Sequence, residues 1–221
     1  ELALLAGNDT DSFNRWEAMQ KLGTKAVLAA YESPDCDAEP DAAFVEAARL
    51  NLVDKDTKDL SLLAYALLLP TEATLMESIE TPIDPTKLHK ARNFVRSCMG
   101  KKLKSELMAR YEQLTPKPDD PYVIDGPNAS RRTFRNVCLT YLSTSLSDAD
   151  AAKLCSEHFK TAGGMTDKAA AYAELCCLPD SEEAKAAVEK FYADADGDAN
   201  VLDKWFASQA RADVDDLLPR V

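Results

Sequence analysis

The chain has 221 residues, of which 46% are hydrophobic and 29% are charged, and its net charge is −12. This composition is typical of a folded globular protein, and the negative charge repels phosphate backbones and anionic membrane surfaces. We therefore expect no nucleic-acid partner and no membrane partner. The longest apolar stretch covers only residues 60–69, whereas a membrane-spanning helix needs about 20 apolar residues.

Helical signals begin at the first residues and continue through the first half of the chain. Asp11 can cap a helix that runs to about Tyr31, and the Ser-Pro-Asp sequence at residues 33–35 ends it. Pro70 stops an apolar helix, and Thr71 can begin the next one. The helices expected in this half cover residues 11–31, 41–53 and 60–69, followed by a short helix from residue 71.

A long helix is expected over residues 86–114, because apolar side chains recur there at intervals of three and four. The next stretch, residues 115–128, contains four prolines and is the longest irregular part of the chain. Proline lacks a backbone donor and restricts the residue before it, so helices rarely continue through such a stretch. We expect any subdivision of the chain near residues 115–128.

Helical periodicity returns after residue 128 and continues to a last strong helix near Trp205. Helix caps are expected at Ser147, Thr166 and Asp180. Apolar and polar residues do not alternate with a period of two over any long segment, so no sheet is expected. The sequence predicts an all-α fold of about ten helices in antiparallel pairs, forming a curved α-α superhelix similar to ARM and HEAT arrays.

Six cysteines are spread along the chain without a C-x-x-C pair. Four of them lie on apolar helical faces, where a cysteine behaves as a small hydrophobic side chain. These four are Cys98, Cys138, Cys155 and Cys176. A core of this size does not need disulfides, so we expect reduced thiols and an intracellular, cytoplasmic location.

The two histidines cannot begin a zinc-peptidase helix, because neither is followed by the glutamate of H-E-x-x-H. Cys155 and His158 could place two metal ligands one helical turn apart, but zinc needs four ligands, or three with water. We favour a packed cysteine beside a surface histidine. The sequence therefore predicts no catalytic residue and no metal ligand in this chain.

Acidic residues around Gly197 resemble a calcium-binding loop. If Gly197 occupies the sixth loop position, Tyr192 falls at the first position, where an acidic ligand is required. Asp203 would also replace the usual bidentate glutamate. We therefore favour a solvated acidic turn between two helices.

Basic residues gather in two places despite the negative net charge. Residues 87–110 contain eight lysines and arginines, and a second cluster consists of Arg131, Arg132 and Arg135. The second cluster is a candidate contact for an anion or a protein partner. A solvated face that balances acidic neighbours is the other interpretation, and we favour it because surface charge is common.

Five segments carry motifs in a fixed order. Residues 8–18 read N-D-T-D-S-F-N-R-W-E-A, and residues 203–210 read D-K-W-F-A-S-Q-A. The other three are 69–77 (L-P-T-E-A-T-L-M-E), 131–142 (R-R-T-F-R-N-V-C-L-T-Y-L) and 165–167 (M-T-D). Together they resemble the C-terminal helical domain of aminopeptidase N enzymes, which are zinc metallopeptidases of the alanyl aminopeptidase kind. Gly164 departs from the family, which has an asparagine there.

The resemblance implies that residues 1–221 are part of this C-terminal α-superhelical domain, truncated at its C-terminal end. It also implies that the zinc site lies upstream, in the catalytic domain of the same polypeptide. This chain would then have no cofactor and no catalytic role, and would shape the access of peptide substrates. The alternative is a stand-alone helical-repeat module that binds a protein partner.

The first motif also suggests an interdomain contact. Arginine and tryptophan are favoured at the centres of protein interfaces. We therefore expect Arg15, Trp16 and Glu17 to contact the catalytic domain, unless Trp16 belongs to the core.

Overall fold

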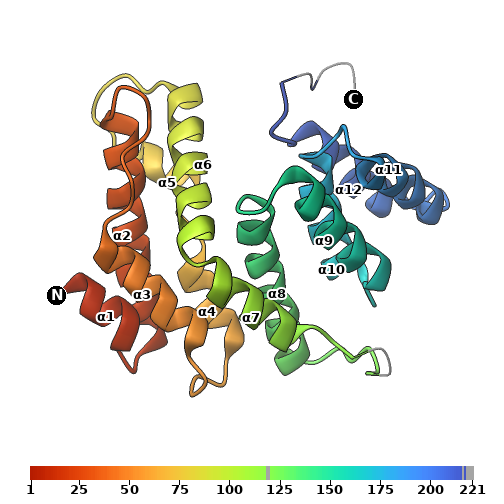
Figure 1. The fold of residues 1–221 in the computed structure, drawn as a ribbon, viewed down its shortest axis with the longest axis horizontal. Coiled ribbons are helices and arrows are strands. Elements are labelled where there is room, and N and C mark those ends of the chain that lie inside the picture. Colours follow the sequence, from red (N-terminus) through yellow and green to blue (C-terminus); the bar gives the residue numbers. More distant parts are fainter. Residues whose placement is uncertain (118–119, 216, 218–221) are drawn as a thin grey trace. The chain divides into compact units, whose positions relative to one another are not determined.

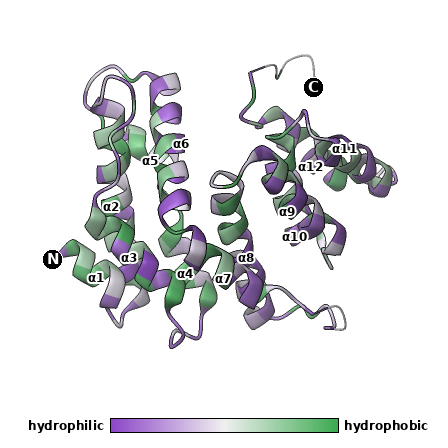
Figure 2. Cartoon of the chain, in the orientation of Figure 1, coloured by the Kyte–Doolittle hydropathy of each residue, from purple (hydrophilic) through white to green (hydrophobic). Residues whose placement is uncertain are grey.

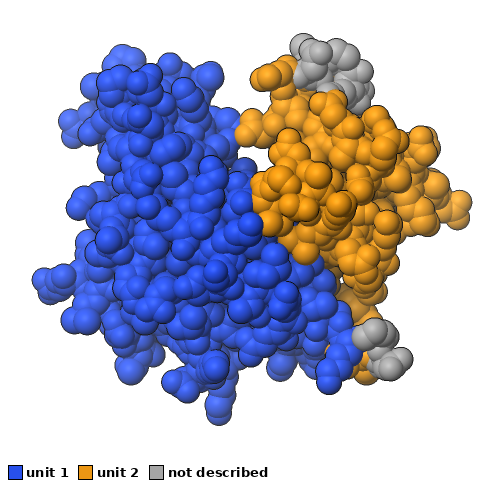
Figure 3. Space-filling view, viewed as in Figure 1, with its two compact units in different colours: residues 1–118, 123–145 blue, residues 119–122, 146–221 orange. Residues whose placement is uncertain are grey.

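The computed structural model describes residues 1–117, 120–215 and 217. Within them the chain forms twelve helices and no strand, so the predicted all-α fold is confirmed (Figure 1). Contacts divide the chain into two compact units, coloured separately in Figure 3. Unit 1 comprises residues 1–118 and 123–145, and unit 2 comprises residues 119–122 and 146–221. The subdivision expected at residues 115–128 stays a prediction.

Unit 1 contains eight helices, most of which begin on a residue suited to capping. They are α1 (Leu2–Asn8), α2 (Ser12–Glu32), α3 (Ala42–Val53), α4 (Leu60–Leu67), α5 (Glu72–Met76), α6 (Pro85–Lys102), α7 (Lys104–Leu114) and α8 (Gly126–Ser143). An aspartate carboxylate accepts backbone N–H groups at the starts of α2, α3, α4, α6 and α8. Each such cap stabilises its helix by about 1 kcal/mol, and its charge favours the positive end of the helix dipole.

The helices of unit 1 bury one apolar face each, and Figure 2 shows the resulting bands of hydrophobic and hydrophilic residues. Helix α2 packs on α1, α4 and α6, while α8 packs on α4 and α7. One contact is unusually close. A Cβ atom at Gly100 of α6 would lie 2.6 Å from the Tyr141 carbonyl oxygen of α8, so only glycine fits without a shift of the helices.

The long helix expected over residues 86–114 is two helices, α6 and α7, which meet at Leu103. This residue has a φ of −112° and a ψ of 14°, and its side chain is buried. The break lets α6 pack on α2 while α7 packs on α3 and α8. The expectation of one helix was wrong because neither proline nor glycine marks the break, which is imposed by tertiary packing.

Side chains satisfy the backbone carbonyls of residues 67–70, which leave α4 without continuing as a helix. Tyr141 Oη donates to the Leu67 carbonyl at 2.6 Å, and Gln20 Nε2 donates to the next carbonyl at 2.8 Å. The guanidinium of Arg92 donates to the last two carbonyls. A buried carbonyl without a partner is costly, so these donors fix the path of the segment.

Unit 2 contains four helices joined by short turns. They are α9 (Asp148–Thr161), α10 (Met165–Cys176), α11 (Glu182–Ala195) and α12 (Ala199–Ala210). Its core is aromatic: the ring centroids of Tyr172 and Phe191 lie 4.5 Å apart, and Phe159 lies 6.4 and 6.3 Å from them. Tyr122 belongs to this unit because its ring packs against the backbone of residues 163–164, where both residues are glycines.

Candidate functional site

The surface of unit 1 is hollowed beside the first turns of α2. A groove of about 500 Å³ lies between α2, α4 and the segment that leads into α5. Its apolar lining includes Phe13, Trp16, Tyr65, Leu68 and Pro70. Phe13 is 62% exposed, Tyr65 48% and Leu68 39%, which is unusual for three large apolar side chains on one surface.

Trp16 is the residue of the expected interdomain contact that lies in this groove. Its side chain is half-buried, and its ring centroid is 5.6 Å from that of Phe13. An aromatic pair that is partly exposed offers a large, rigid contact area to a partner. The groove therefore has an aromatic lining that is held in place by α2.

Arg15 has a different position, inside unit 1. Its Nη1 lies 2.7 Å from Asp54 Oδ2, and its Nη2 donates to Asn51 Oδ1 at 2.9 Å. Asn51 in turn donates to the carbonyls of Ala6 and Ala47, both at 2.8 Å. Arg15 thus joins α2 to α3 and, through Asn51, to α1.

Asp54 is the anionic partner in this network. Burial alone would raise the pKa of Asp54, but hydrogen bonds from the Thr57 backbone, from Arg15 and from the Asp56 backbone hold it well below its usual range. The carboxylate is therefore charged at neutral pH and balances the buried guanidinium.

Glu17 lies at the edge of the same helix and is half-buried. Its carboxylate pairs with Lys21 Nζ at 3.0 Å, and both side chains are about half exposed. A surface pair of this kind contributes between about 0 and 1 kcal/mol. The structure therefore places Arg15, Trp16 and Glu17 in three different environments, and their contact with another domain stays a prediction.

The arginine cluster on α8 is largely internal to unit 1. Arg132 Nη1 donates to the Val123 carbonyl at 3.1 Å. Arg135 is buried, donates to Tyr111 Oη at 3.2 Å and stacks over the same ring at 4.9 Å. Arg131 is half-buried. The contact of these three arginines with an anion or partner stays a prediction.

The basic run of residues 87–110 also divides into internal and exposed charges. Arg110 is buried, donates to the carbonyls of Leu52 and Asp54, and stacks over Phe134 at 5.0 Å. Burial lowers the pKa of Arg110. Lys102, by contrast, is exposed and pairs with Glu39 at 2.7 Å. Arg110 of this run thus joins α7 to the end of α3, whereas Lys90, Lys101, Lys102 and Lys104 are exposed.

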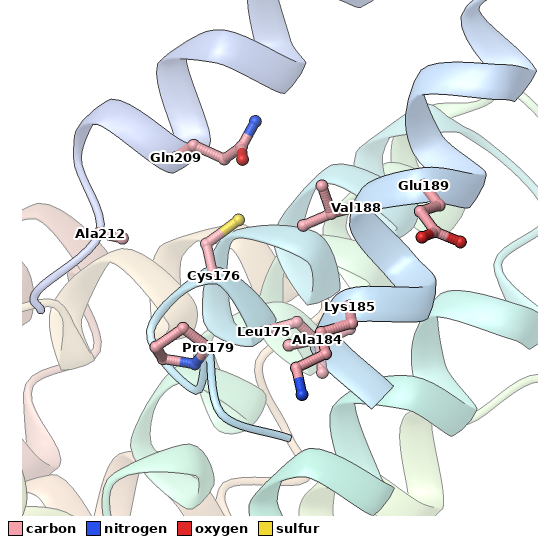
Figure 4. Close-up of a pocket in the computed structure, with 9 residues that line it drawn as sticks. All are labelled: Leu175, Cys176, Pro179, Ala184, Lys185, Val188, Glu189, Gln209 and Ala212. Carbon is pink, nitrogen blue, oxygen red and sulfur yellow. The ribbon is translucent and has the colours of Figure 1, made fainter. Parts of the chain in front are cut away.

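A smaller pocket of about 350 Å³ lies in unit 2 between α10, α11 and α12 (Figure 4). Cys176 and Val188 project into it, and the amide of Gln209 lies on the side of α12. Burial raises the pKa of the Cys176 thiol to about 12, so the thiol is protonated and is a poor nucleophile. The pocket can take an apolar group but offers no catalytic constellation.

The structure corrects the expectation of a surface histidine at position 158. His158 is fully buried, and its Nε2 lies 4.0 Å from Oδ1 of Asp167, which is itself 4% exposed. Cys155 is buried on the same helix. Across residues 1–117, 120–215 and 217, no three His, Cys, Asp or Glu side chains group as metal ligands.

The acidic residues around Gly197 form a turn, as we favoured. Asp196 ends α11 in the left-handed conformation with a φ of 46°, and Asp198 caps α12. Asp194 is bound by Lys168 and Lys190, whose side chains lower its pKa through hydrogen bonds. These carboxylates are used to end one helix, begin the next and pair with lysines.

No helix in the described part of the chain has the length and hydrophobicity needed to cross a bilayer.

A family model described as "Domain of unknown function (DUF3458_C) ARM repeats" matches residues 1–221. The chain belongs to this family. The description as ARM repeats agrees with the helical array expected from the sequence.

Two curated relatives are both named aminopeptidase N. The protein from Caulobacter vibrioides is 33% identical over 219 residues, which are 99% of this chain and 24% of that protein. The protein from Haemophilus influenzae is 29% identical over 218 residues, which are 94% of this chain and 23% of that protein. The chain thus spans about a quarter of the length of these relatives.

A solved structure has the same fold. It is the crystal structure of Legionella pneumophila aminopeptidase A in complex with aspartic acid, with a TM-score of 0.80 and 25% identity over 99% of this chain and 26% of that one. The resemblance to the aminopeptidase N family is therefore confirmed. The chain corresponds to a helical part of these proteins.

The groove residues Tyr65 and Leu68 were missed in the sequence. Residues 60–69 are apolar except for Ser61. A helix at the surface of a unit buries only part of its circumference, so an apolar run longer than the buried stripe leaves some side chains exposed. The length of this apolar run was therefore the sequence signal for exposed apolar side chains.

Proposed function

We propose that this chain is the C-terminal helical domain of a zinc-dependent aminopeptidase N, which removes N-terminal amino acids from peptides. The observation that carries the proposal is the similarity of nearly the whole chain to two proteins named aminopeptidase N. The fold shared with an aminopeptidase A supports it. Six cysteine thiols support an intracellular, cytoplasmic location.

The chain itself does not fit a zinc site. His158 is enclosed beside Asp167, and His89 is engaged with Glu72 at 2.7 Å and with Asn93 at 2.9 Å. Neither histidine belongs to a set of three potential ligands in the described residues. In this proposal zinc is held by the catalytic domain of the same polypeptide, and the helical domain shapes the access of peptide substrates.

The groove beside α2 is the proposed contact with that catalytic domain. It exposes aromatic and aliphatic side chains that are costly to leave in water, and aromatic side chains are the residues that anchor interfaces. Trp16 is central to this contact because its rigid ring lines the groove beside Phe13.

The activity is tested with the full-length parent and with this chain alone, using an alanine chromogenic anilide. We expect turnover only with the parent, and we expect a zinc chelator to abolish it. Turnover by the 221-residue chain would contradict the proposal. The reading frame before Glu1 distinguishes the enzyme from the alternative, a stand-alone module. An encoded H-E-x-x-H supports the enzyme, and its absence supports the module.

The docking role of the groove is tested by binding this chain to the separately expressed remainder of the parent. Replacing Trp16 with serine should weaken binding by about 30-fold, because an anchor of this type contributes about 2 kcal/mol or more. Tyr192→Ser is the matched control, since Tyr192 is a 54% exposed aromatic residue outside the groove. Equal weakening by both variants would remove the groove from the interface.

A further inference from the structure

Helix α6 has a continuous polar face. Its members recur at intervals of three and four residues, which places them in one row along the helix. They are His89, Arg92, Asn93 and Arg96. A neighbouring face is apolar and buried, with Leu88, Ala91 and Val95 at 0% exposure. The two arginines therefore point from the same side of α6, one helical turn apart.

Arg92 is half-buried and is held in a fixed orientation. Its Nε donates to the Pro70 carbonyl at 2.8 Å, and its Nη2 donates to the Leu69 carbonyl at 3.3 Å. Nη1 makes no hydrogen bond within the described residues. The guanidinium is thus pre-oriented by two neutral acceptors rather than by an ion pair.

Arg96 is half-buried, and its Nε is enclosed without a hydrogen-bond partner among the described residues. An enclosed N–H group that lacks an acceptor costs about 1–3 kcal/mol, and more when the group is charged. Arg15, the buried arginine of α2, also has an enclosed Nε without a partner among the described residues, but its Nη1 and Nη2 have a carboxylate and an amide oxygen as acceptors. Arg96 has the same chemistry without the acceptors.

No carboxylate of the described residues forms an ion pair with Arg92 or Arg96. Burial lowers the pKa of Arg92 and the charge of Arg96 lowers it further, while the charge of Glu72 opposes this. Glu72, the nearby acid on α5, is engaged by His89 at 2.7 Å. The two arginines therefore form a positive site that Glu72 compensates only in part.

The remaining neighbour is Tyr141 of α8, and it cannot supply the missing charge. Burial raises the pKa of Tyr141 to about 12, although both arginines oppose the rise. Its hydroxyl is neutral at physiological pH and donates to the Leu67 carbonyl at 2.6 Å. Tyr141 therefore does not neutralise the two arginines.

We propose that Arg92 and Arg96 form a binding site for a carboxylate group. The planar guanidinium fork matches the two oxygens of a carboxylate, and such charge-assisted bonds are among the strongest in proteins. A monoanion suits the half-buried position because a second negative charge would add to the cost of desolvation. The carboxylate can come from a chain terminus or from an acidic side chain. The proposal concerns this chain alone and does not depend on the proposed enzyme.

The test is an NMR titration of the 221-residue chain at constant ionic strength, with three probes. N-acetylalanine carries a terminal carboxylate, N-acetylalanine amide carries none, and N-acetylglutamic acid α-amide carries only a side-chain carboxylate. We expect at least one of the two carboxylates to bind and the neutral amide not to bind. Preference for one carboxylate identifies the source, and equal affinity shows that the site accepts both.

The variants Arg96→Gln and Lys90→Gln make the test specific. Lys90 is exposed on α6, and it controls for the loss of one positive charge on the same helix. Arg96→Gln should weaken carboxylate binding by about tenfold or more, because hydrogen bonds to charged groups contribute about 1.5–3 kcal/mol. Lys90→Gln should leave the affinity unchanged, and circular dichroism should show that both variants are folded.

Three results would overturn the proposal. They are equal binding of the neutral amide, no binding of either carboxylate, and the same affinity in the chain and in Arg96→Gln. Since no peptidase activity is measured, failure here leaves the proposed function untouched.

Discussion

The two units of this chain are stabilised by different chemistry. Unit 1 is tied together by polar side chains that reach across it, such as Asn51, Arg92, Arg110 and Tyr141, each of which donates to a backbone carbonyl. Unit 2 has an aromatic centre of Phe159, Tyr172 and Phe191. The difference follows from the connections: unit 1 has longer non-helical segments, whose carbonyls need donors, and unit 2 has short turns.

Charge separates the two units as well. Unit 2 holds 18 of the 38 acidic residues but only 8 of the 26 basic ones. The negative charge of the chain is therefore mainly a property of unit 2, while unit 1 is close to balanced. Arguments from net charge about partners apply more strongly to unit 2 than to unit 1.

The largest loss of stability is expected from a substitution in the aromatic centre of unit 2. Phe191→Ala should lower the free energy of unfolding by about 3–5 kcal/mol, because it leaves a cavity between Tyr172 and Phe159. The chain has one tryptophan in each unit, so urea unfolding followed in single-tryptophan variants reports the units separately. The loss should appear at Trp205, and Glu189→Ala, at an exposed position of α11, should have a small effect. An equal shift at Trp16 would show that the units unfold together.

A smaller effect is expected in unit 1, where polar contacts replace the aromatic core. Asp54→Asn should cost about 1.5–3 kcal/mol at pH 7, because Arg15 loses its charged partner. The pKa of Asp54 is lowered in the folded state, so its contribution is present above the unfolded pKa of about 3.9 and is lost as the pH falls below it.

Unfolding from pH 7 to pH 3 measures this dependence. The difference in unfolding free energy between the chain and Asp54→Asn should shrink as the pH falls below about 5. A difference that stays constant to pH 3 would show that the charge of Asp54 does not contribute.

A still smaller loss of stability is expected when one hydrogen bond to the carbonyls of residues 67–70 is removed. Tyr141→Phe removes the hydrogen bond to the Leu67 carbonyl and should cost about 1 kcal/mol. Tyr65→Phe is the control, since Tyr65 is 48% exposed. Chemical denaturation of both variants, followed at Trp16, measures the difference. If the two variants are equally stable, this hydrogen bond does not hold the segment.

The last experiment changes no residue and compares how easily each of the two units opens. Burial raises the pKa of Cys138, in unit 1, and of Cys155 and Cys176, in unit 2, so these thiols should react with a disulfide reagent only after local opening. Labelling in increasing urea, read by mass spectrometry, should show which unit opens first. Immediate reaction of Cys155 in the native chain would contradict its burial.

Most local signals were read correctly from the sequence, whereas tertiary ones were not. Two expected caps were wrong: α10 begins after Gly164 rather than at Thr166, and α11 is capped by Ser181 rather than by Asp180. The helix starts expected at Asp11, residue 41 and Thr71 are all observed, because a capping side chain acts on its own neighbouring N–H groups. The break at Leu103 and the burial of His158 depend on helices that are distant in sequence. Hydrophobic periodicity within one segment cannot reveal these contacts. A polar residue on a helix can face either solvent or another polar residue, and the periodicity is the same in both cases.

The candidate site was likewise predicted only in part from the sequence. The sequence singled out Trp16, which lines the groove, but placed it with Arg15, whose guanidinium is internal. Two adjacent residues of a helix point about 100° apart, so a linear motif can join an internal residue and a surface residue. Which of them faces outward depends on the helices that pack against α2.

The close contact at Gly100 constrains how related chains can vary. A methyl group at this position would meet the backbone of α8, which cannot rotate away as a side chain can. A homologue with alanine or serine there must therefore have a wider spacing between α6 and α8. The residue at position 100 thus indicates the spacing of this helix pair. Homologues with a larger residue there should also have larger side chains between the two helices.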